Sequence, residues 1–342
     1  MLGFNNDIAI DLGTATTMVH VRGKGIVIRE PSVVAVETST GRVLSIGSEA
    51  ARMLGRTPAS IQAIRPLSDG VISDYLLTEE MIRFYIRKVC GQLRTIKPRV
   101  MVCVPSITTD VEARAIVEAA ASAGARRVYL IEEPVAAAIG LDIDITKPHG
   151  VMVTDIGGGT TDIAVISLGG VSVSSSIKVA GNKFDEAIAR YIRRKCSVAI
   201  GDQTAENIKI QCACAWPKPV KTSYEAKGLN VITGLPQVVT VDSEEMREAL
   251  EEPLTLIGDA VHSVLEKTPP ELVGDISQDG ILLTGGGSLL DGLDQYISKR
   301  TGIKAVVAPQ APDCVVLGCA RALEKYSNLA EGSKLFRSNL YN

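Results

Sequence analysis

Two segments of the sequence carry the same order of aspartate, glycine and threonine. Residues 11–17 read Asp-Leu-Gly-Thr-Ala-Thr-Thr, and residues 155–161 read Asp-Ile-Gly-Gly-Gly-Thr-Thr. Each segment lies between two apolar stretches, which predicts two β-hairpins that turn at glycine. The N–H groups of such turns point into one concavity and bind anions such as phosphate. The threonine hydroxyls would add further donors.

The two aspartates pose an electrostatic problem. Asp11 and Asp155 would lie at strand ends beside the turns, where a carboxylate repels phosphate unless a cation lies between them. Hydrated Mg²⁺ prefers oxygen ligands and keeps several of its waters, so it resolves this conflict. A single hairpin of this kind is usually only a turn. Two copies at corresponding places predict a polyphosphate held between two similar halves.

Three further features could complete such a site. Gly285–Gly287 follow an apolar strand and would let an adenine or ribose lie against the backbone, although Ser288 could equally be a plain helix cap. Glu206 and Lys209 lie three residues apart on a predicted helix and could hold the nucleoside. An exposed ion pair between them is an equal alternative. Glu132 and Glu133 precede Pro134 at a predicted helix start. A carboxylate there is commonly a helix cap, and the alternative is that one of the two orients a water for attack on phosphate.

Strands and helices alternate along both halves of the chain. Helices are predicted over 78–93, 111–121, 183–195, 205–211, 243–267 and from 314 to about 326, and another opens at Pro134. Short strands with turns at Gly228 and 234–236 are predicted for 217–241. Strands at 8–10, 100–104, 128–131, 150–154, 163–166 and 281–283 complete the pattern. This alternation is typical of βαβ units and predicts an α/β fold.

Composition excludes several classes of protein. The chain has 342 residues, 46% hydrophobic and 22% charged, with a formal net charge of −3. A slightly negative chain lacks the excess of basic residues that is typical of a nucleic-acid-binding protein. Neither a signal peptide nor a membrane span is evident, so we expect a cytosolic protein. Seven irregularly spaced cysteines and three histidines favour reduced, buried thiols over a Cys/His metal site.

The residues described so far resemble one superfamily. The segments 11–14, 133–134, 155–161 and 285–288 are similar to those of the actin, heat-shock chaperone and sugar-kinase ATPases. Within that superfamily the chain resembles the MreB/Mbl family over roughly residues 5 to 326. The strings that carry this second resemblance are 23–27, 65–66, 69–72, 97–99, 132–140, 265–272 and 283–287.

The resemblance implies a fold and a division of the chain. We expect an actin-like, two-lobed α/β fold made of duplicated ribonuclease H-like domains around a central nucleotide cleft. Residues 1–147 would form the first lobe (subdomains IA and IB), completed by a C-terminal helix over 313–342. Residues 148–312 would form the second lobe (subdomains IIA and IIB).

The resemblance also assigns roles to residues. Glu133, Thr161 and Asp155 would be catalytic, with Glu133 orienting the hydrolytic water. Asp11 and Asp155 would face Mg²⁺ through water. The residues implied to bind ATP or ADP are Asp11, Gly13, Thr14, Ala15, Thr16, Gly157, Gly158, Gly159, Thr160, Thr161, Glu206, Asn207, Ile208, Lys209, Gly285, Gly286, Gly287 and Ser288.

The family further implies a cytoskeletal role. Its members form paired protofilaments with ATP at the inner membrane face and organise peptidoglycan synthesis. The implied partners are further copies of the chain, lipids, a membrane-anchored RodZ-type adaptor and MreC/MreD-type proteins, but no nucleic acid. Leu2 and Phe4 at the terminus, with Leu93 and Ile96 in a predicted turn, are candidate membrane contacts. A frayed terminus is the alternative for the first pair.

The chain differs from the usual family sequence at two places, and two other functions on the same fold are possible alternatives. Asp162 stands where the family usually has glutamate, and the stretch 211–224 is unlike the usual family sequence. A small-molecule kinase on the same fold would need a general-base aspartate near the γ-phosphate, and no clear candidate is present. A chaperone would carry a peptide-binding domain after the ATPase, whereas this chain ends about sixteen residues after its last predicted helix.

Overall fold

The computed structural model describes residues 7–91, 97–325 and 337–338, and two mixed sheets form its centre. The first sheet has the order β19-β10-β9-β1-β2-β3. Its strands are β1 (Ile8–Leu12), β2 (Thr16–Val21), β3 (Gly25–Pro31), β9 (Arg99–Val104), β10 (Arg127–Glu132) and β19 (Arg337–Ser338). β1 pairs antiparallel with β2 and parallel with β9, which places the end of β1 beside the end of β9.

The second sheet repeats this arrangement. Its order is β13-β12-β11-β17-β18, made of β11 (Val151–Ile156), β12 (Thr161–Ser167), β13 (Gly170–Ile177), β17 (Ile281–Thr284) and β18 (Ala305–Val307). β11 pairs antiparallel with β12 and parallel with β17, as β1 does with β2 and β9. The two predicted hairpins are therefore confirmed.

Helices cover the outer faces of both sheets. On the first sheet, α2 (Tyr75–Cys90) and α3 (Asp110–Ser122) bury an apolar core with β1, β9 and β10. On the second sheet, α5 (Gly181–Cys196) and α8 (Glu251–Lys267) do the same with β11, β12 and β17. Each helix presents one apolar stripe to its sheet, as the periodicity of the sequence predicts.

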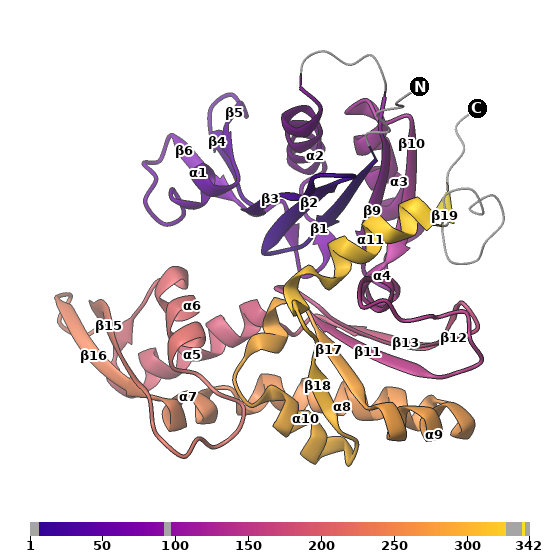
Figure 1. The fold of residues 1–342 in the computed structure, drawn as a ribbon. Helices are drawn as coiled ribbons and strands as arrows, with labels where there is room; N and C mark the ends of the chain where they lie inside the picture. Colours follow the sequence, from indigo (N-terminus) through magenta and orange to yellow (C-terminus); the bar gives the residue numbers. More distant parts are fainter. Residues whose placement is uncertain (1–6, 92–96, 326–336, 339–342) are drawn as a thin grey trace.

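Two helices lie between the sheets (Figure 1). α4 (Glu133–Gly140) and α11 (Cys314–Lys325) share one buried core with residues of both sheets. Their backbones approach closely: a Cβ atom at Gly140 would lie 1.9 Å from the carbonyl oxygen of Cys314, and one at Gly318 would lie 1.7 Å from that of Ala136. Glycine is required at both positions, so this crossing fixes the place of Glu133 at the start of α4.

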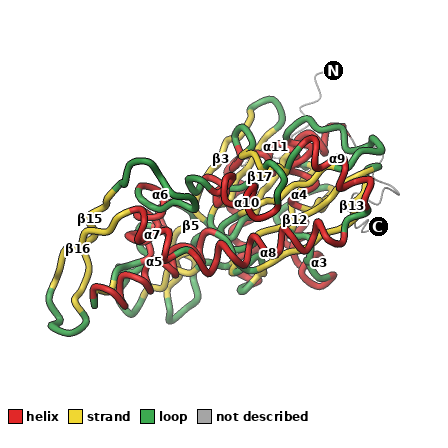
Figure 2. Tube along the Cα trace, turned by 90° about the horizontal axis from the view of Figure 1, so that it is seen from below, coloured by secondary structure: helices red, strands yellow, loops and turns green. Residues whose placement is uncertain are grey.

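Smaller elements extend from each half. β4 (Val34–Glu37), β5 (Val43–Ile46), β6 (Ile61–Ile64) and α1 (Ser48–Ala51) extend the first, and β7 (Leu67–Ser68) and β8 (Val71–Ile72) form a short ribbon. β14 (Val198–Ala199), α6 (Asp202–Gln211), β15 (Ser223–Asn230), β16 (Pro236–Asp242) and α7 (Ser243–Ala249) extend the second. Figure 2 shows the β15–β16 ribbon reaching out from the body of the molecule.

Three expectations about these elements were wrong. The helix predicted over 243–267 is two helices, α7 and α8, separated at Leu250, because Pro253 in the first turn of α8 has no N–H to continue the ladder from α7. Gly228 lies inside β15 rather than at a turn. A Cβ atom there would lie 2.4 Å from the carbonyl oxygen of Ala199, so the glycine admits the neighbouring strand.

The third error concerns the C-terminal segment. A helix over 313–342 is contradicted at both ends, since Asp313 belongs to a 3₁₀ turn and Arg337–Ser338 form strand β19 against β10.

Helix α9 (Pro270–Asp279) was not predicted at all. It begins with Pro at its first turn, where proline is tolerated. α10 (Leu293–Thr301) follows a 3₁₀ turn at Gly286–Leu289. The lobe boundaries at 147/148 and 312/313 stay predictions.

No helix within the described ranges is both long and apolar enough to cross a membrane.

Candidate nucleotide site between the two hairpins

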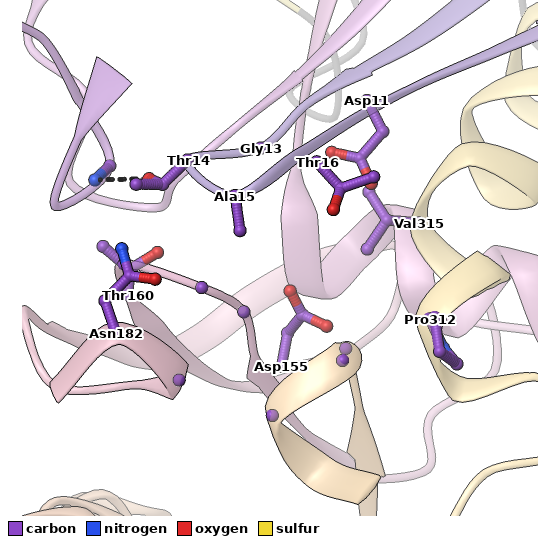
Figure 3. A pocket seen from close by; sticks show the side chains of 18 of the residues that line it. Asp11, Gly13, Thr14, Ala15, Thr16, Asp155, Thr160, Asn182, Pro312 and Val315 are labelled. Carbon is purple, nitrogen blue, oxygen red and sulfur yellow. Dashed lines mark hydrogen bonds between the residues drawn. The ribbon is translucent and has the colours of Figure 1, made fainter. Parts of the chain in front are cut away.

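A cavity of about 660 Å³ lies where the two hairpins face each other. The turn of the first hairpin and that of the second are in close contact. A Cβ atom at Gly158 would lie 2.5 Å from Cβ of Ala15, and one at Gly159 would lie 2.6 Å from Oγ1 of Thr14. The approach of the two turns therefore depends on the glycines of the second turn, and together the turns form one wall of the cavity (Figure 3).

Asp11 and Asp155 project into this cavity from opposite sides (Figure 3). Each lies near the end of the first strand of its hairpin and accepts a hydrogen bond from the neighbouring parallel strand. Oδ1 of Asp11 accepts from the thiol of Cys103 at 3.2 Å, and Oδ1 of Asp155 accepts from the hydroxyl of Thr284 at 2.7 Å. The duplicated strand pairing thus fixes both carboxylates toward a shared space.

The carboxylates of the site disfavour one another's charge. Burial raises the pKa of Asp11 to about 6 and, with Asp11 and Asp162 nearby, that of Asp155 to about 7. Burial, followed by repulsion from Asp162, Asp155 and Asp11, raises the pKa of Glu133 well above its ordinary value. A hydrated divalent cation between Asp11 and Asp155 would relieve this repulsion, and their oxygens are the ligand type that Mg²⁺ takes.

The described residues do not form a metal cage by themselves. Among the residues that the structure describes, no group of three or more His, Cys, Asp or Glu side chains could hold a metal ion. A cation at Asp11 and Asp155 would therefore need ligands from water and from phosphate. This is the usual way in which Mg²⁺ accompanies a nucleotide, so the residues fit the expectation.

The amino end of α5 adds a feature that the sequence reading missed. Gly181 and Asn182 line the cavity, and their N–H groups donate to the carbonyl oxygens of Gly157 and Gly158 at 3.1 and 2.8 Å. The positive end of a 16-residue helix thus lies directly behind the second turn. The sequence predicts that this helix begins at residue 183, but α5 begins two residues earlier, at Gly181. The prediction missed this start because glycine does not indicate the beginning of a helix.

The candidate nucleoside residues also line the cavity. Gly285, Gly286, Gly287, Glu206 and Lys209 line it. Lys209 donates to Oδ2 of Asp185 at 2.8 Å, and Glu206 accepts from Gln203 at 3.2 Å. Glu206 and Lys209 therefore have different partners, and the alternative of an exposed ion pair between the two is wrong.

Several residues that the resemblance assigns to the site do not line the cavity. Thr161 is buried and donates its hydroxyl to the carbonyl oxygen of Val179 at 2.7 Å. Ser288 is buried and donates to the carbonyl of Gly285 at 2.7 Å. Asn207 and Ile208 on α6 do not line the cavity, whereas Gly13, Thr16 and Thr160 do. Leu2, Phe4, Leu93 and Ile96 lie outside the described residues.

Three further residues, to which the motifs assigned no binding role, lie in the cavity wall or close behind it. Asp162 does not line the cavity: it is buried and accepts from the backbone N–H of Ser106 at 2.9 Å, which links β12 to the loop after β9. Lys218, from the stretch 211–224, and Asp291 line the cavity itself. The approach of 211–224 to the Gly285–Gly287 turn depends on tertiary packing that no local pattern reports.

Comparisons with known proteins agree with this geometry. The MreB/Mbl protein family matches residues 5–331. The cell shape-determining protein Mbl of Bacillus subtilis is 49% identical over 326 residues, covering 95% of this chain and 98% of that protein. The cell shape-determining protein MreB of Escherichia coli is 50% identical over 326 residues, with 94% of each chain covered.

Solved structures extend the comparison. MreB5 of Spiroplasma citri bound to ADP superposes with a TM-score of 0.91 at 36% identity, covering 96% of this chain and 99% of that chain. The MamK double helical filament, at 23% identity and a TM-score of 0.79, shares the fold. Two α/β halves around a central cavity, matched by these structures, define an actin-like fold. The chain belongs to the MreB/Mbl family.

Proposed function

We propose that this chain binds ATP with Mg²⁺ in the cavity between the two hairpins, hydrolyses it slowly and assembles into filaments. One observation carries the proposal: Asp11 and Asp155, each buried near a strand end beside a glycine turn, enter one cavity from opposite sides. Solved MreB5 structures at 35–36% identity hold ADP in one case and AMPPNP in the other. A nucleotide spanning both halves would favour one closed arrangement of them.

The roles of the residues follow from their places. When bound, Mg²⁺ would offset the charge of the phosphates. The two turns would bind the phosphates through N–H groups, the positive end of α5 behind the second turn would favour their negative charge, and the Gly285–Gly287 turn would take the nucleoside. Glu133 opens α4 beside the carboxylates and would orient the attacking water. Thr161, whose hydroxyl is held by Val179, would act by fixing the end of β12.

The cellular role rests on the relatives. The similar proteins of Bacillus subtilis and Escherichia coli are both named cell shape-determining. We propose the same role here: paired protofilaments in the cytoplasm at the inner membrane face that organise peptidoglycan synthesis. The partners would be lipids contacted by Leu2, Phe4, Leu93 and Ile96, a RodZ-type adaptor and MreC/MreD-type proteins. We propose the lobes as 1–147 and 148–312.

Sedimentation and electron microscopy of the purified chain test this proposal. Mg-ATP should increase the pelleted fraction and give filaments, on lipid or in solution, and phosphate should be released slowly. Chelation of Mg²⁺ should reverse the effect, since the two aspartates would then repel the phosphates. A chain that stays monomeric with every nucleotide, on lipid and in solution, would contradict the filament role. Failure to bind any nucleotide would contradict the site itself.

A further inference from the structure

The chain between α6 and β15 packs against residues 291 and 292, a few residues after the Gly285–Gly287 turn. Cys214 forms a parallel bridge with Asp291, and the N–H of Ala215 donates to the carbonyl of Asp291 at 2.7 Å. Trp216 packs on Gly292, where a Cβ atom would lie 2.6 Å from Cβ of Trp216. Gly292 also has a φ of 74°, so glycine is needed there twice over. Residues 214–216 are therefore fixed against the loop that follows the glycine turn.

One ion pair strengthens this contact at the edge of the cavity. Nζ of Lys218 lies 2.7 Å from Oδ2 of Asp291. The Lys218 side chain is 19% exposed and that of Asp291 is 63% exposed. Both residues line the cavity, together with Lys209, Ala213 and Leu290. The pair thus joins the small extension of the second half to the wall that would hold the nucleoside.

We propose that the Lys218–Asp291 pair is a clasp that retains the nucleotide. The inference rests on the proposed function, because it takes the part of the cavity lined by Gly285–Gly287 as the nucleoside site. The two residues act as positioning residues: they hold residues 212–218 and the loop 288–292 together in the cavity wall. A nucleoside that leaves between these two segments would require them to separate, and the ion pair opposes that separation.

The clasp predicts a specific kinetic signature. Breaking it should speed dissociation of the nucleotide, while association, limited by other steps, changes little. Because one partner is largely exposed, the effect is modest, about three- to fivefold. Salt screens a partly exposed pair, so the parental dissociation rate should rise with ionic strength. ATP and ADP share the same base and ribose, so both should respond equally.

Stopped-flow displacement of fluorescent ADP and of a fluorescent ATP analogue tests the clasp. The variants are Lys218→Met, Asp291→Asn, their combination, and the charge exchange Lys218→Asp with Asp291→Lys. Lys221→Met is the matched control: Lys221 lies in the same segment and pairs with Asp242 and Glu244, but it lines a second cavity. Circular dichroism and thermal melting confirm that each variant is folded.

Support would consist of faster dissociation in both single variants, no further increase in the double variant, partial rescue by the charge exchange and a parental rate for Lys221→Met. Folded single variants that release nucleotide at the parental rate would overturn the clasp while leaving the proposed function intact. An acceleration confined to the ATP analogue would also overturn it, because that places the effect at the phosphates. A parental chain that binds no nucleotide would overturn both.

Discussion

The two hairpins share a plan but differ in how their aspartates and turns are supported. Asp11 accepts a hydrogen bond from a thiol, Cys103, at 3.2 Å, whereas Asp155 accepts one from a hydroxyl, Thr284, at 2.7 Å. A thiol is the weaker donor. The first turn contains one glycine and the second contains three.

The elements behind the turns differ as well. The second turn is held by the N–H groups that open α5, a helix of 16 residues. The first is held by loops: Ser32 donates to the carbonyl of Gly13 at 2.6 Å, and the hydroxyl of Thr14 accepts from the N–H of Gly70 at 3.1 Å. We infer that the second hairpin is the preorganised half of the proposed phosphate site and that the first adjusts to it.

The largest expected effect belongs to a residue outside both hairpins. Glu133 would act on the attacking water, so Glu133→Ala should reduce phosphate release by about a hundredfold or more while nucleotide affinity stays near the parental value. Filaments of the variant should persist. Nucleotide fluorescence and phosphate release, measured on the same preparation, check this. Hydrolysis at the parental rate would make Glu133 only the opening residue of α4.

Removing each aspartate charge tests the comparison itself. Asp155→Asn should weaken binding of Mg-ATP by about tenfold to a hundredfold, because a charged group of a preorganised site is lost. Asp11→Asn should cost less, since its hairpin is the adjustable one. Titration of both variants with fluorescent ATP in Mg²⁺ compares them. An equal or larger loss for Asp11→Asn would contradict the inferred difference.

The raised pKa values predict opposite pH trends with and without nucleotide. The pKa of Asp155 is about 7 in the folded chain and 3.8 ordinarily, so the folded state binds more protons between these values. Stability from this group is fully present below the ordinary pKa and is lost as pH rises through 7. The nucleotide-free chain should therefore melt at a higher temperature at pH 6 than at pH 8.

Mg-nucleotide requires the ionised carboxylates, so the stabilisation it adds should be larger at pH 8. Thermal melting with and without Mg-ADP measures both trends. In Asp155→Asn the pH dependence of the nucleotide-free chain should become flatter. A slope as steep as that of the parent would assign the titration to other groups.

The repeat and its hairpins could be predicted because their signals are local. An apolar strand, an aspartate and a glycine turn recur at 11–17 and 155–161, and the structure places them in corresponding strands. The groups that donate hydrogen bonds to the aspartates come from other strands, and no local sequence pattern indicates them. Cys103 and Thr284 meet the aspartates only through parallel pairing, which the sequence pattern suggests without fixing its register.

The errors in the prediction have two origins. The break at Leu250 depends on a proline inside a continuous apolar pattern, and Gly228 serves a neighbouring strand rather than a turn. Lys218 reaches the cavity only because residues 214–216 are fixed against Asp291 and Gly292. The places of Gly228 and Lys218 are set by tertiary contacts, which override local preference, whereas the break at Leu250 has a local cause that the apolar periodicity conceals.

The smallest expected effect tests whether the donor to each aspartate matters. A hydrogen bond with Cys319, together with burial and the nearby Asp11 and Glu133, raises the pKa of Cys103 well above its ordinary value, so it remains a thiol donor. Thr284→Cys would give the second aspartate the weaker donor of the first, and Cys103→Ser would do the reverse.

Thr284→Cys should weaken Mg-ATP binding by about two- to threefold, and Cys103→Ser should strengthen it slightly or leave it unchanged. Fluorescence titration at fixed Mg²⁺ measures both, with Thr284→Ser as the control that keeps a hydroxyl. Weaker binding after Cys103→Ser with no change after Thr284→Cys would mean that fit at each site, rather than donor strength, distinguishes the two hairpins.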